Sequence, residues 1–285
     1  MNTWPPLMAL AAGLSAALAH AQPAPPAPVT PVTPVSPVTP PGAATPPAPV
    51  VPPAAVRALP PLPPLPPEPG RTYAPGPFDR LELAGAARVI VVQGERDQAF
   101  VAGDAEVQKG VDVVLNDRQL VIRPAGGWKF WSNQKLFVHV EMRELRQLSV
   151  SGASDVHAPG PLRTDQLKLS ISGAGVARLD QLQARQLSFS ISGAGDGQLG
   201  GRVDELTLQI SGKGKVVADR LQAQRARVSV SGIGNVVLWV MDDLNAHISG
   251  IGSVDYFGSP QVQRSVSGMG NINARGEKKP SVDSR

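Results

Sequence analysis

Alternating apolar residues run along the second half of the chain, and each run ends at a Ser-Gly pair. Leu187, Phe189 and Ile191, for example, alternate with polar residues directly before Ser192 and Gly193. A period of two places such side chains on one face of a β-strand. Successive pairs are spaced by 21, 20, 19, 20, 18 and 18 residues, which is typical of a repeat architecture. The pairs are Ser151-Gly152, Ser172-Gly173, Ser192-Gly193, Ser211-Gly212, Ser231-Gly232, Ser249-Gly250 and Ser267-Gly268.

Most copies share the pattern Ser-Gly-x-Gly-x-Val after the alternating run. The first copy has Ser154 in place of the second glycine, and Ala177 and Gly197 replace the Val or Ile found in the other copies. Two close glycines permit a tight corner where a Cβ would clash with a neighbouring chain segment. We expect the serine hydroxyls to bond to one another or to turn amides along the stack.

A unit of this size cannot bury its apolar face alone, whereas stacked copies form a continuous core. The repeat therefore predicts an all-β fold, a single-stranded parallel β-helix or solenoid with coils of about 20 residues. Each coil is expected to contain two or three short strands. Parallel coils lie about 4.8 Å apart, so the serines would form a column roughly 29 Å long.

Short alternating segments separated by glycines precede the repeat. Leu81-x-Leu83 and Val89 to Val92 are of this kind, and Val111-x-Val113 is expected to pair with Leu120-x-Ile122. No stretch of ten or more residues keeps a helical period, so this part is also predicted to be β.

The first 70 residues have a different composition. Residues 1–21 carry no charged residue, and the apolar run from Leu7 to Ala19 ends in a small-x-small pattern, which predicts a cleaved signal peptide; the alternative is an uncleaved anchor. Residues 22–70 contain 21 of the 30 prolines and predict a disordered proline-rich linker, because proline withholds a backbone donor. This linker is a spacer, a stalk decorated on Thr and Ser, or a ligand for a proline-binding groove.

Charge and cysteine content narrow the class of partner. The net charge is +4, part of which lies near the C-terminus, and residues 277–285 are predicted to be a basic flexible tail. This mild excess favours an anionic surface or a solvated terminus and does not indicate a nucleic-acid partner. The chain has no cysteine, so it has no disulfide framework.

Other repeat classes do not match the residues. A leucine-rich repeat would need an Asn or Cys that no copy supplies, and a calcium-binding nonapeptide would need Asp after each Gly-x-Gly, where only Asp196 follows. A dinucleotide loop would need a third glycine and a helix. No cofactor is expected.

Ser-Gly-x-Gly-x-Val recurring every 18 to 21 residues after alternating strands resembles the head GIN domain family of auto-transporter adhesins. The entry segment, from Phe78-Asp79-Arg80-Leu81 to Gln93-Gly94, is similar as well, and the predicted domain covers residues 71–276. The resemblance implies a β-solenoid exported to the periplasm or surface of a Gram-negative bacterium. It supplies no catalytic residues.

The segment Trp128, Lys129, Phe130 and Trp131 concentrates aromatic residues in a chain with only 4% of them. As a binding loop it could stack on sugar rings or enter a lipid interface. The alternative is a structural cap that protects a sheet edge of the solenoid.

Polar residues give no catalytic or metal-binding spacing. His20, His139, His157 and His247 are expected at the surface, and no metal site is predicted. Asp155, Asp196 and Asp255 follow turns; they are either catalytic carboxylates in a groove or solvent-facing turn residues. Trp239 and Met241 are interpreted as core or sheet-face residues.

The function expected from these features is that of an exported, non-enzymatic β-solenoid of the cell envelope, an adhesin or a binding or structural module on a proline-rich spacer. Possible partners are an envelope glycan, a lipid surface or another envelope protein, with no transmembrane span in the mature chain. The alternative is a polysaccharide-acting β-helix enzyme, a lyase or hydrolase; regulation of envelope signalling is a third hypothesis.

Overall fold

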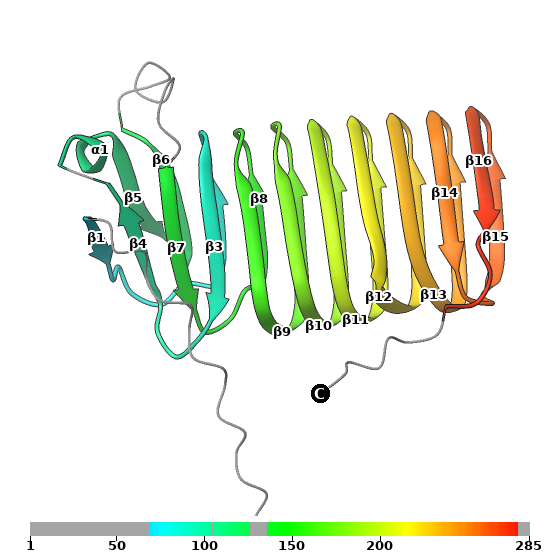
Figure 1. The fold of residues 1–285 in the computed structure, drawn as a ribbon, viewed down its shortest axis with the longest axis horizontal. Coiled ribbons are helices and arrows are strands. Elements are labelled where there is room, and N and C mark those ends of the chain that lie inside the picture. The colour runs from blue at the N-terminus through cyan, green and yellow to red at the C-terminus, as the bar shows by residue number, and fades with distance from the viewer. Residues whose placement is uncertain (1–68, 104, 126–135, 279–285) are drawn as a thin grey trace, which may run out of the picture. The chain divides into compact units, whose positions relative to one another are not determined.

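Strands dominate the part of the chain that the computed structural model describes, which is residues 69–103, 105–125 and 136–278. These residues belong to one compact unit, Leu59–Arg285. They form a 16-stranded sheet and one short helix, α1 (Ala105–Lys109). The predicted all-β solenoid is confirmed, with about six turns (Figure 1).

The strands before the repeat are short. They are β1 (Gly70–Tyr73), β2 (Arg80–Leu83), β3 (Ala87–Gln93), β4 (Gln98–Ala102), β5 (Val111–Asn116), β6 (Gln119–Pro124), β7 (Leu136–Met142) and β8 (Gln147–Val150). The strands of the repeat are β9 (Asp155–Ile171), β10 (Val176–Ile191), β11 (Ala194–Ile210), β12 (Lys213–Val230), β13 (Ile233–Ile248), β14 (Ile251–Phe257), β15 (Gln261–Val266) and β16 (Met269–Ala274).

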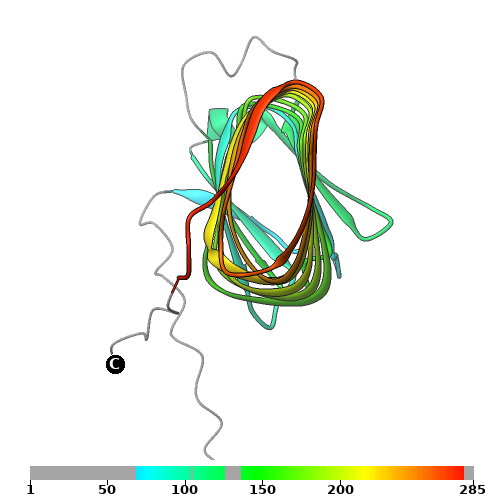
Figure 2. The ribbon, with the colours of Figure 1, turned by 90° about the vertical axis from the view of Figure 1, so that its right-hand side faces the viewer.

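Each coil from β9 to β13 is one long strand of 16 to 18 residues, not the two or three short strands expected from the sequence. The strand leaves a Ser-Gly corner, bends at mid-length and returns along the opposite side, as the end-on view in Figure 2 shows. The expectation was wrong because the parallel ladder to the next coil continues through the bend with only local irregularities.

Coils of unequal length stay in register at the corners. Leu187, for example, pairs with both Leu167 and Leu206. The register shifts between β9 and β12 lie at the bend, as between Leu179 and Leu182, and β12 and β13 have a further shift between Ala223 and Arg225. The bend therefore takes up the differences in repeat spacing, and the residues on either side of each corner remain aligned from coil to coil.

Alternation along the strands builds the core. Leu187, Phe189 and Ile191 are each 1% exposed, and their in-register neighbours on adjacent coils are buried as well. Apolar columns thus run through the interior. Burial of these columns is the main stabilising term, since each fully buried Leu or Ile contributes about 1.5–3 kcal/mol.

The first coils do not stack in chain order. β2 lies between β6 and β8, and β3 lies between β7 and β9, in each case in parallel. The chain therefore forms a coil with β2 and β3, leaves it, and later places β6 and β7 outside that coil. β4 and β1 continue this edge as antiparallel strands, and β5 pairs with β6 as the sequence predicted.

An eighth corner, which the sequence repeat did not reveal, joins β2 to β3 at Ala84 and Gly85. Ser151 N donates to Leu83 O at 2.9 Å, and Ala153 N donates to Gly85 O at 2.7 Å, as in later coils. The Ser-Gly repeat does not include this corner because Ala84 stands where the other copies have serine. The alternating Leu81-x-Leu83 followed by glycine was the available signal.

The C-terminal end of the stack is formed by β14, β15 and β16. β15 pairs with β13 and β16 pairs with β14, each in parallel and in register. At this end, side chains at positions that are buried in the middle coils are exposed to solvent, and Val266 is 44% exposed. In Figure 1 the strands at this end stand at the opposite side of the stack from β1 and β4.

Candidate functional site

The serines of the Ser-Gly corners point outward, and all of them are exposed. Four corner hydroxyls donate weakly to a main-chain carbonyl of the preceding coil, for example Ser231 Oγ to Ile210 O at 3.4 Å. The expectation that the corner hydroxyls bond to one another or to turn amides is therefore wrong for these four serines. The other serine ladder, in which Ser170 Oγ donates to Ser149 Oγ at 3.2 Å, lies on the sheet and not at the corners.

The corner glycines form a continuous column. A Cβ placed on Gly232 would overlap the carbonyl oxygen of Gly212, and the same holds for Gly212 against Gly193. Each carbonyl also accepts a hydrogen bond, as when Ile233 N donates to Gly212 O at 2.9 Å. The corner glycines thus allow the close approach of neighbouring coils, and the role of the Ser-Gly pairs as a structural ladder stays a prediction.

The aromatic segment Trp128, Lys129, Phe130 and Trp131 lies outside the described residues. It connects β6, which ends at Pro124, to β7, which begins at Leu136. Its role as a binding loop or a cap stays a prediction.

The histidines are dispersed over the stack. His139 is half-buried in β7, where burial lowers its pKa below 6.5 and the charge of Glu141 opposes this shift. His157 Nε2 lies 2.8 Å from Asp180 Oδ2, and His247 lies on β13. Within the described ranges, no group of His, Cys, Asp and Glu could hold a metal ion.

The three candidate aspartates do not converge. Asp155 and Asp196 occupy one column, but Val176 of the intervening coil pairs with both and so separates them. Asp196 Oδ1 accepts from Lys215 N at 3.0 Å. Asp255 lies elsewhere, buried, and accepts from Asn273 Nδ2 at 2.9 Å. This geometry does not form a paired-carboxylate site of the kind that glycoside hydrolysis requires.

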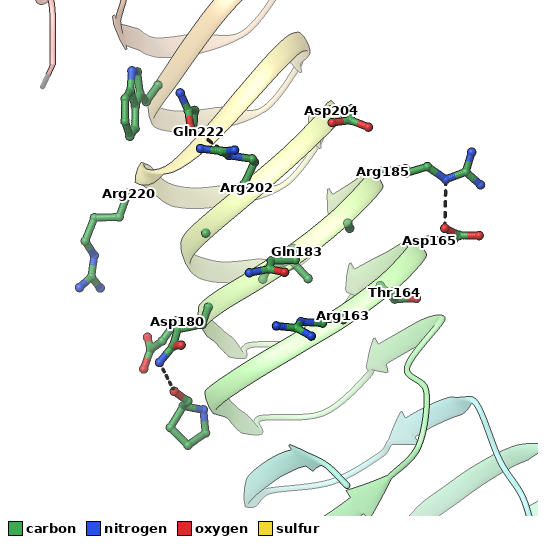
Figure 3. Close-up of a pocket in the computed structure, with 16 residues that line it drawn as sticks. Arg163, Thr164, Asp165, Asp180, Gln183, Arg185, Arg202, Asp204, Arg220 and Gln222 are labelled. Atoms are coloured by element: carbon green, nitrogen blue, oxygen red, sulfur yellow. Dashed lines mark hydrogen bonds and ion pairs between the residues drawn. The ribbon is translucent and has the colours of Figure 1, made fainter. Parts of the chain in front are cut away.

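A hollow of about 1230 Å³ lies along the bend of strands β9 to β13 and along the part of each strand that follows the bend, which we call the returning limb. Figure 3 shows its polar side chains on successive coils. Four of them form what we call the Arg/Gln ladder: Arg163, Gln183, Arg202 and Gln222. Gln183 is in register with Arg163 and Arg202, and Arg202 is in register with Gln222.

The Arg/Gln ladder exists because polar residues alternate with buried ones on these limbs. Leu182 and Ala184 flank Gln183 and face the interior, so the amide faces solvent. Arg202 Nε donates to Gln222 Oε1 at 3.1 Å, which orients that guanidinium along the stack. Trp239 follows Gln222 in register and is only 8% exposed, so it closes the ladder at the β13 end as a buried residue, whereas Met241 is 39% exposed.

The column of side chains next to the Arg/Gln ladder contains an ion pair between successive coils. Arg185 Nε lies 3.0 Å from Asp165 Oδ1, and this hydrogen bond lowers the pKa of Asp165 and raises the pKa of Arg185. Both groups are fully solvated, so the pair sets orientation more than stability.

Three arginines of the hollow remain without such a partner. Across the described residues, the ion pairs on this side of the stack join Arg185 to Asp165, Arg225 to Glu205, His157 to Asp180 and Lys278 to Asp219, and none of them uses Arg163, Arg202 or Arg220. Asp180 is bound to His157, which leaves Asp204 as the acidic side chain of the lining without a pair. The hollow therefore presents guanidinium groups that no ion pair among the described residues neutralises, and in the Arg/Gln ladder two of them alternate with the amides of Gln183 and Gln222.

Sequence reasoning missed this ladder because the repeats were compared forward from each serine. Counted backward, each member stands nine residues before the next corner serine: Ser172, Ser192, Ser211 and Ser231 follow Arg163, Gln183, Arg202 and Gln222. The constant spacing survives because the length differences lie at the bend, before the ladder.

The fold and the hollow together define a class, the parallel β-solenoids that display a side-chain ladder on one side of the coil stack. Within this class, residues 77–260 match the family described as "Putative auto-transporter adhesin, head GIN domain". The match covers more than half of the chain, so the chain belongs to this family, as the Ser-Gly-x-Gly-x-Val repeat predicted. β15 and β16 lie beyond it.

Solved structures with the same fold come from Bacteroides and Parabacteroides species. A "putative adhesin" from Bacteroides fragilis is 24% identical with a TM-score of 0.69, and the alignment covers 72% of this chain and 95% of that one. A "putative lipid binding protein" from Parabacteroides distasonis is 20% identical with a TM-score of 0.60, and a "putative adhesin" from the same species is 19% identical with a TM-score of 0.61. Both alignments cover 72% of this chain and 95% of the other. Comparison with curated proteins gave no match.

Proposed function

We propose that this protein is an exported, non-enzymatic binding module of the bacterial cell envelope, of the adhesin type, and that the hollow lined by the Arg/Gln ladder is its ligand-binding surface. Family membership supports the adhesin type. The observation that carries the ligand surface is the register of the Arg/Gln ladder, which repeats polar groups over four coils.

Repetition favours binding over catalysis. Catalysis needs one asymmetric group of residues in which a nucleophile or base is oriented by a partner. The ladder offers instead the same kinds of polar group at regular intervals, which suits a ligand that extends over several coils. The separation of Asp155 from Asp196 removes the paired carboxylates on which the enzyme alternative depended.

Export and display belong to the same proposal. Residues 1–21 act as a signal peptide, and residues 22–70 act as a spacer that carries the solenoid of residues 71–276 and the basic tail of residues 277–285. A polyproline II spacer advances about 3.1 Å per residue, so it could extend to roughly 150 Å. None of the helices in the described ranges is long and apolar enough to cross a bilayer. The location is the periplasm or the outer surface of a Gram-negative cell.

The partners we consider are an envelope glycan, a lipid surface and another envelope protein. Two solved structures of the same fold are described as a "putative adhesin" and as a "putative lipid binding protein". Trp128 and Trp131 would add an aromatic contact if their segment is a binding loop. Replacing both by Ala should then lower binding without changing stability, whereas aggregation of the variant would indicate a cap.

The experiment that tests the proposal has two parts. Cell fractionation should place the intact protein in the envelope and a variant without residues 1–21 in the cytoplasm; cytoplasmic retention of the intact protein would contradict export. The purified chain should then bind at least one surface in a screen of bacterial glycans, anionic and neutral vesicles, and whole cells. Binding to none of them would contradict the binding function.

A further inference from the structure

We propose that the Arg/Gln ladder binds a linear, carboxylate-bearing polysaccharide in which acidic and neutral sugars alternate, and that this polymer lies along the stack axis across β9 to β12. The inference rests on the proposed function, because it names the ligand class of the same hollow. It is carried by three observations: the spacing of the ladder, its alternation of charge, and its lack of internal ion pairs.

The spacing matches a stretched glycan. Parallel coils lie about 4.8 Å apart, so Arg163 and Arg202, with Gln183 between them, are about 9.6 Å apart at their backbones. An extended glycan advances by roughly one inter-strand distance for each sugar ring. Successive rings therefore meet successive coils, and an acid on every second ring meets an arginine each time.

The side chains suit those two kinds of sugar. A guanidinium binds a carboxylate through two parallel hydrogen bonds, which gives direction as well as charge. Gln183 and Gln222 offer an amide that both donates and accepts, which suits the hydroxyl and acetamido groups of neutral sugars. Because Gln222 Oε1 already holds Nε of Arg202, the guanidinium is oriented while its other N–H groups remain available.

The surroundings disfavour a more densely charged polymer. Asp204 and the Asp165–Arg185 pair border the ladder, so an anion on every ring would meet carboxylates as well as arginines. A nucleic acid would gain from clustered cations and from aromatic faces for base stacking. The one aromatic residue of the lining, Trp239, is 8% exposed and cannot present its ring face.

The test is titration calorimetry of the full purified chain with three oligosaccharides of equal length. Hyaluronan fragments alternate glucuronate with N-acetylglucosamine, oligogalacturonate carries an acid on every ring, and dextran is neutral. We expect the hyaluronan fragments to bind at least tenfold more tightly than either of the others, with affinity that falls as salt rises.

Paired variants locate the site. R163Q/R202Q keeps the amide character of the ladder while it removes the two charges, and we expect at least a tenfold loss of hyaluronan affinity. R178Q/R227Q removes two arginines that do not line the hollow, and it should stay within twofold of the wild-type protein. Melting curves check that both variants remain folded.

Three results would overturn the inference: no binding of hyaluronan fragments, tighter binding of oligogalacturonate or dextran, or an equal loss in both double variants. Each is distinguishable from failure of the proposed function. A protein that binds cells or vesicles but none of these glycans keeps the proposed function and loses this ligand class, whereas a protein that binds no surface loses both.

Discussion

At the scale of single residues, the absence of a side chain is what matters most at the corners. Every corner glycine after Gly85 has the carbonyl oxygen of the preceding corner glycine where its Cβ would be. The constraint is steric and comes from the neighbouring coil, which is why it repeats with the coil and not with the local turn type.

Gly232→Ala should therefore lower the stability of the solenoid by about 2 to 3 kcal/mol, since the new methyl group must push two coils apart. Gly160→Ala is the matched control, because a Cβ there meets nothing within 4 Å. It should change stability by less than about 0.5 kcal/mol. Thermal melting of both variants checks the prediction, and equal melting temperatures would contradict it.

The corner serines should matter far less than the glycines beside them. Ser231 is exposed, and its hydroxyl donates to Ile210 O at the long distance of 3.4 Å. We expect Ser231→Ala to cost less than about 0.5 kcal/mol in urea unfolding, because water replaces so weak a bond. A loss comparable to that of Gly232→Ala would show that the hydroxyl column stabilises the stack.

At the scale of the coil, departures from the repeat pattern compensate one another. Gly197 stands where most copies have Val, and a Cβ there would collide with the ring of Phe189, the bulkiest member of its interior column. Because Gly197 has no side chain, the ring of Phe189 occupies the space that a valine side chain would take there. The small residue in one coil and the large residue in the adjacent coil therefore fill this part of the core together.

This pairing predicts strong coupling between the two positions. Gly197→Val alone should destabilise the protein by about 2 to 3 kcal/mol through overpacking, and Phe189→Leu alone by about 1 kcal/mol. The free energy of unfolding of the double variant should be about 1 kcal/mol higher than the sum of the two single effects predicts. Urea unfolding of all four proteins measures the coupling, and simple additivity would contradict it.

The last coil has an electrostatic anchor at Asp255. Burial raises the pKa of this carboxyl, but hydrogen bonds from Asn273 and Arg275 outweigh that effect, so the pKa lies below the ordinary 3.8. A carboxyl whose pKa is lower when folded adds stability above the unfolded pKa, and this stability is lost as the pH falls through the folded pKa.

Asp255→Asn should therefore destabilise the protein at pH 7, by about 1 to 2 kcal/mol, because a hydrogen bond to a charged acceptor is replaced by a weaker one. The difference from the wild-type protein should shrink as the pH is lowered below 3.8. Asp242→Asn changes an exposed carboxylate that has no ion pair in the described ranges, and serves as the control. A difference that persists unchanged at pH 3 would contradict the prediction.

At the scale of the whole solenoid, the two ends of the stack are protected differently. At the N-terminal end β1 and β4 add antiparallel strands beyond β7. At the other end the last coil itself carries a charge: Arg264 is in register with Ala246, whose column is buried in the coils before it. A charge at an interior position opposes edge-to-edge association, a device that natural sheets use against aggregation.

Arg264→Leu should consequently promote association through the open end, because it completes the apolar column. Light scattering after size exclusion should show more dimer or longer assemblies than for the wild-type protein at equal concentration. Arg227→Leu adds the same apolar residue at a position that faces solvent on β12, and it controls for general loss of solubility. Identical mass distributions for all three proteins would contradict the role of Arg264.

The repeat in the sequence predicted the fold class, the coil length, the corners and the family, because periodicity and small corner residues leave few other solutions. Only the tertiary structure decided which residues share a column. Arg163, Gln183, Arg202 and Gln222 are about 20 residues apart in sequence, and register shifts at the bend set which of them become neighbours. The corner at Gly85 and the order of β2, β6 and β8 likewise depend on pairing between distant segments, which local patterns along one strand do not encode.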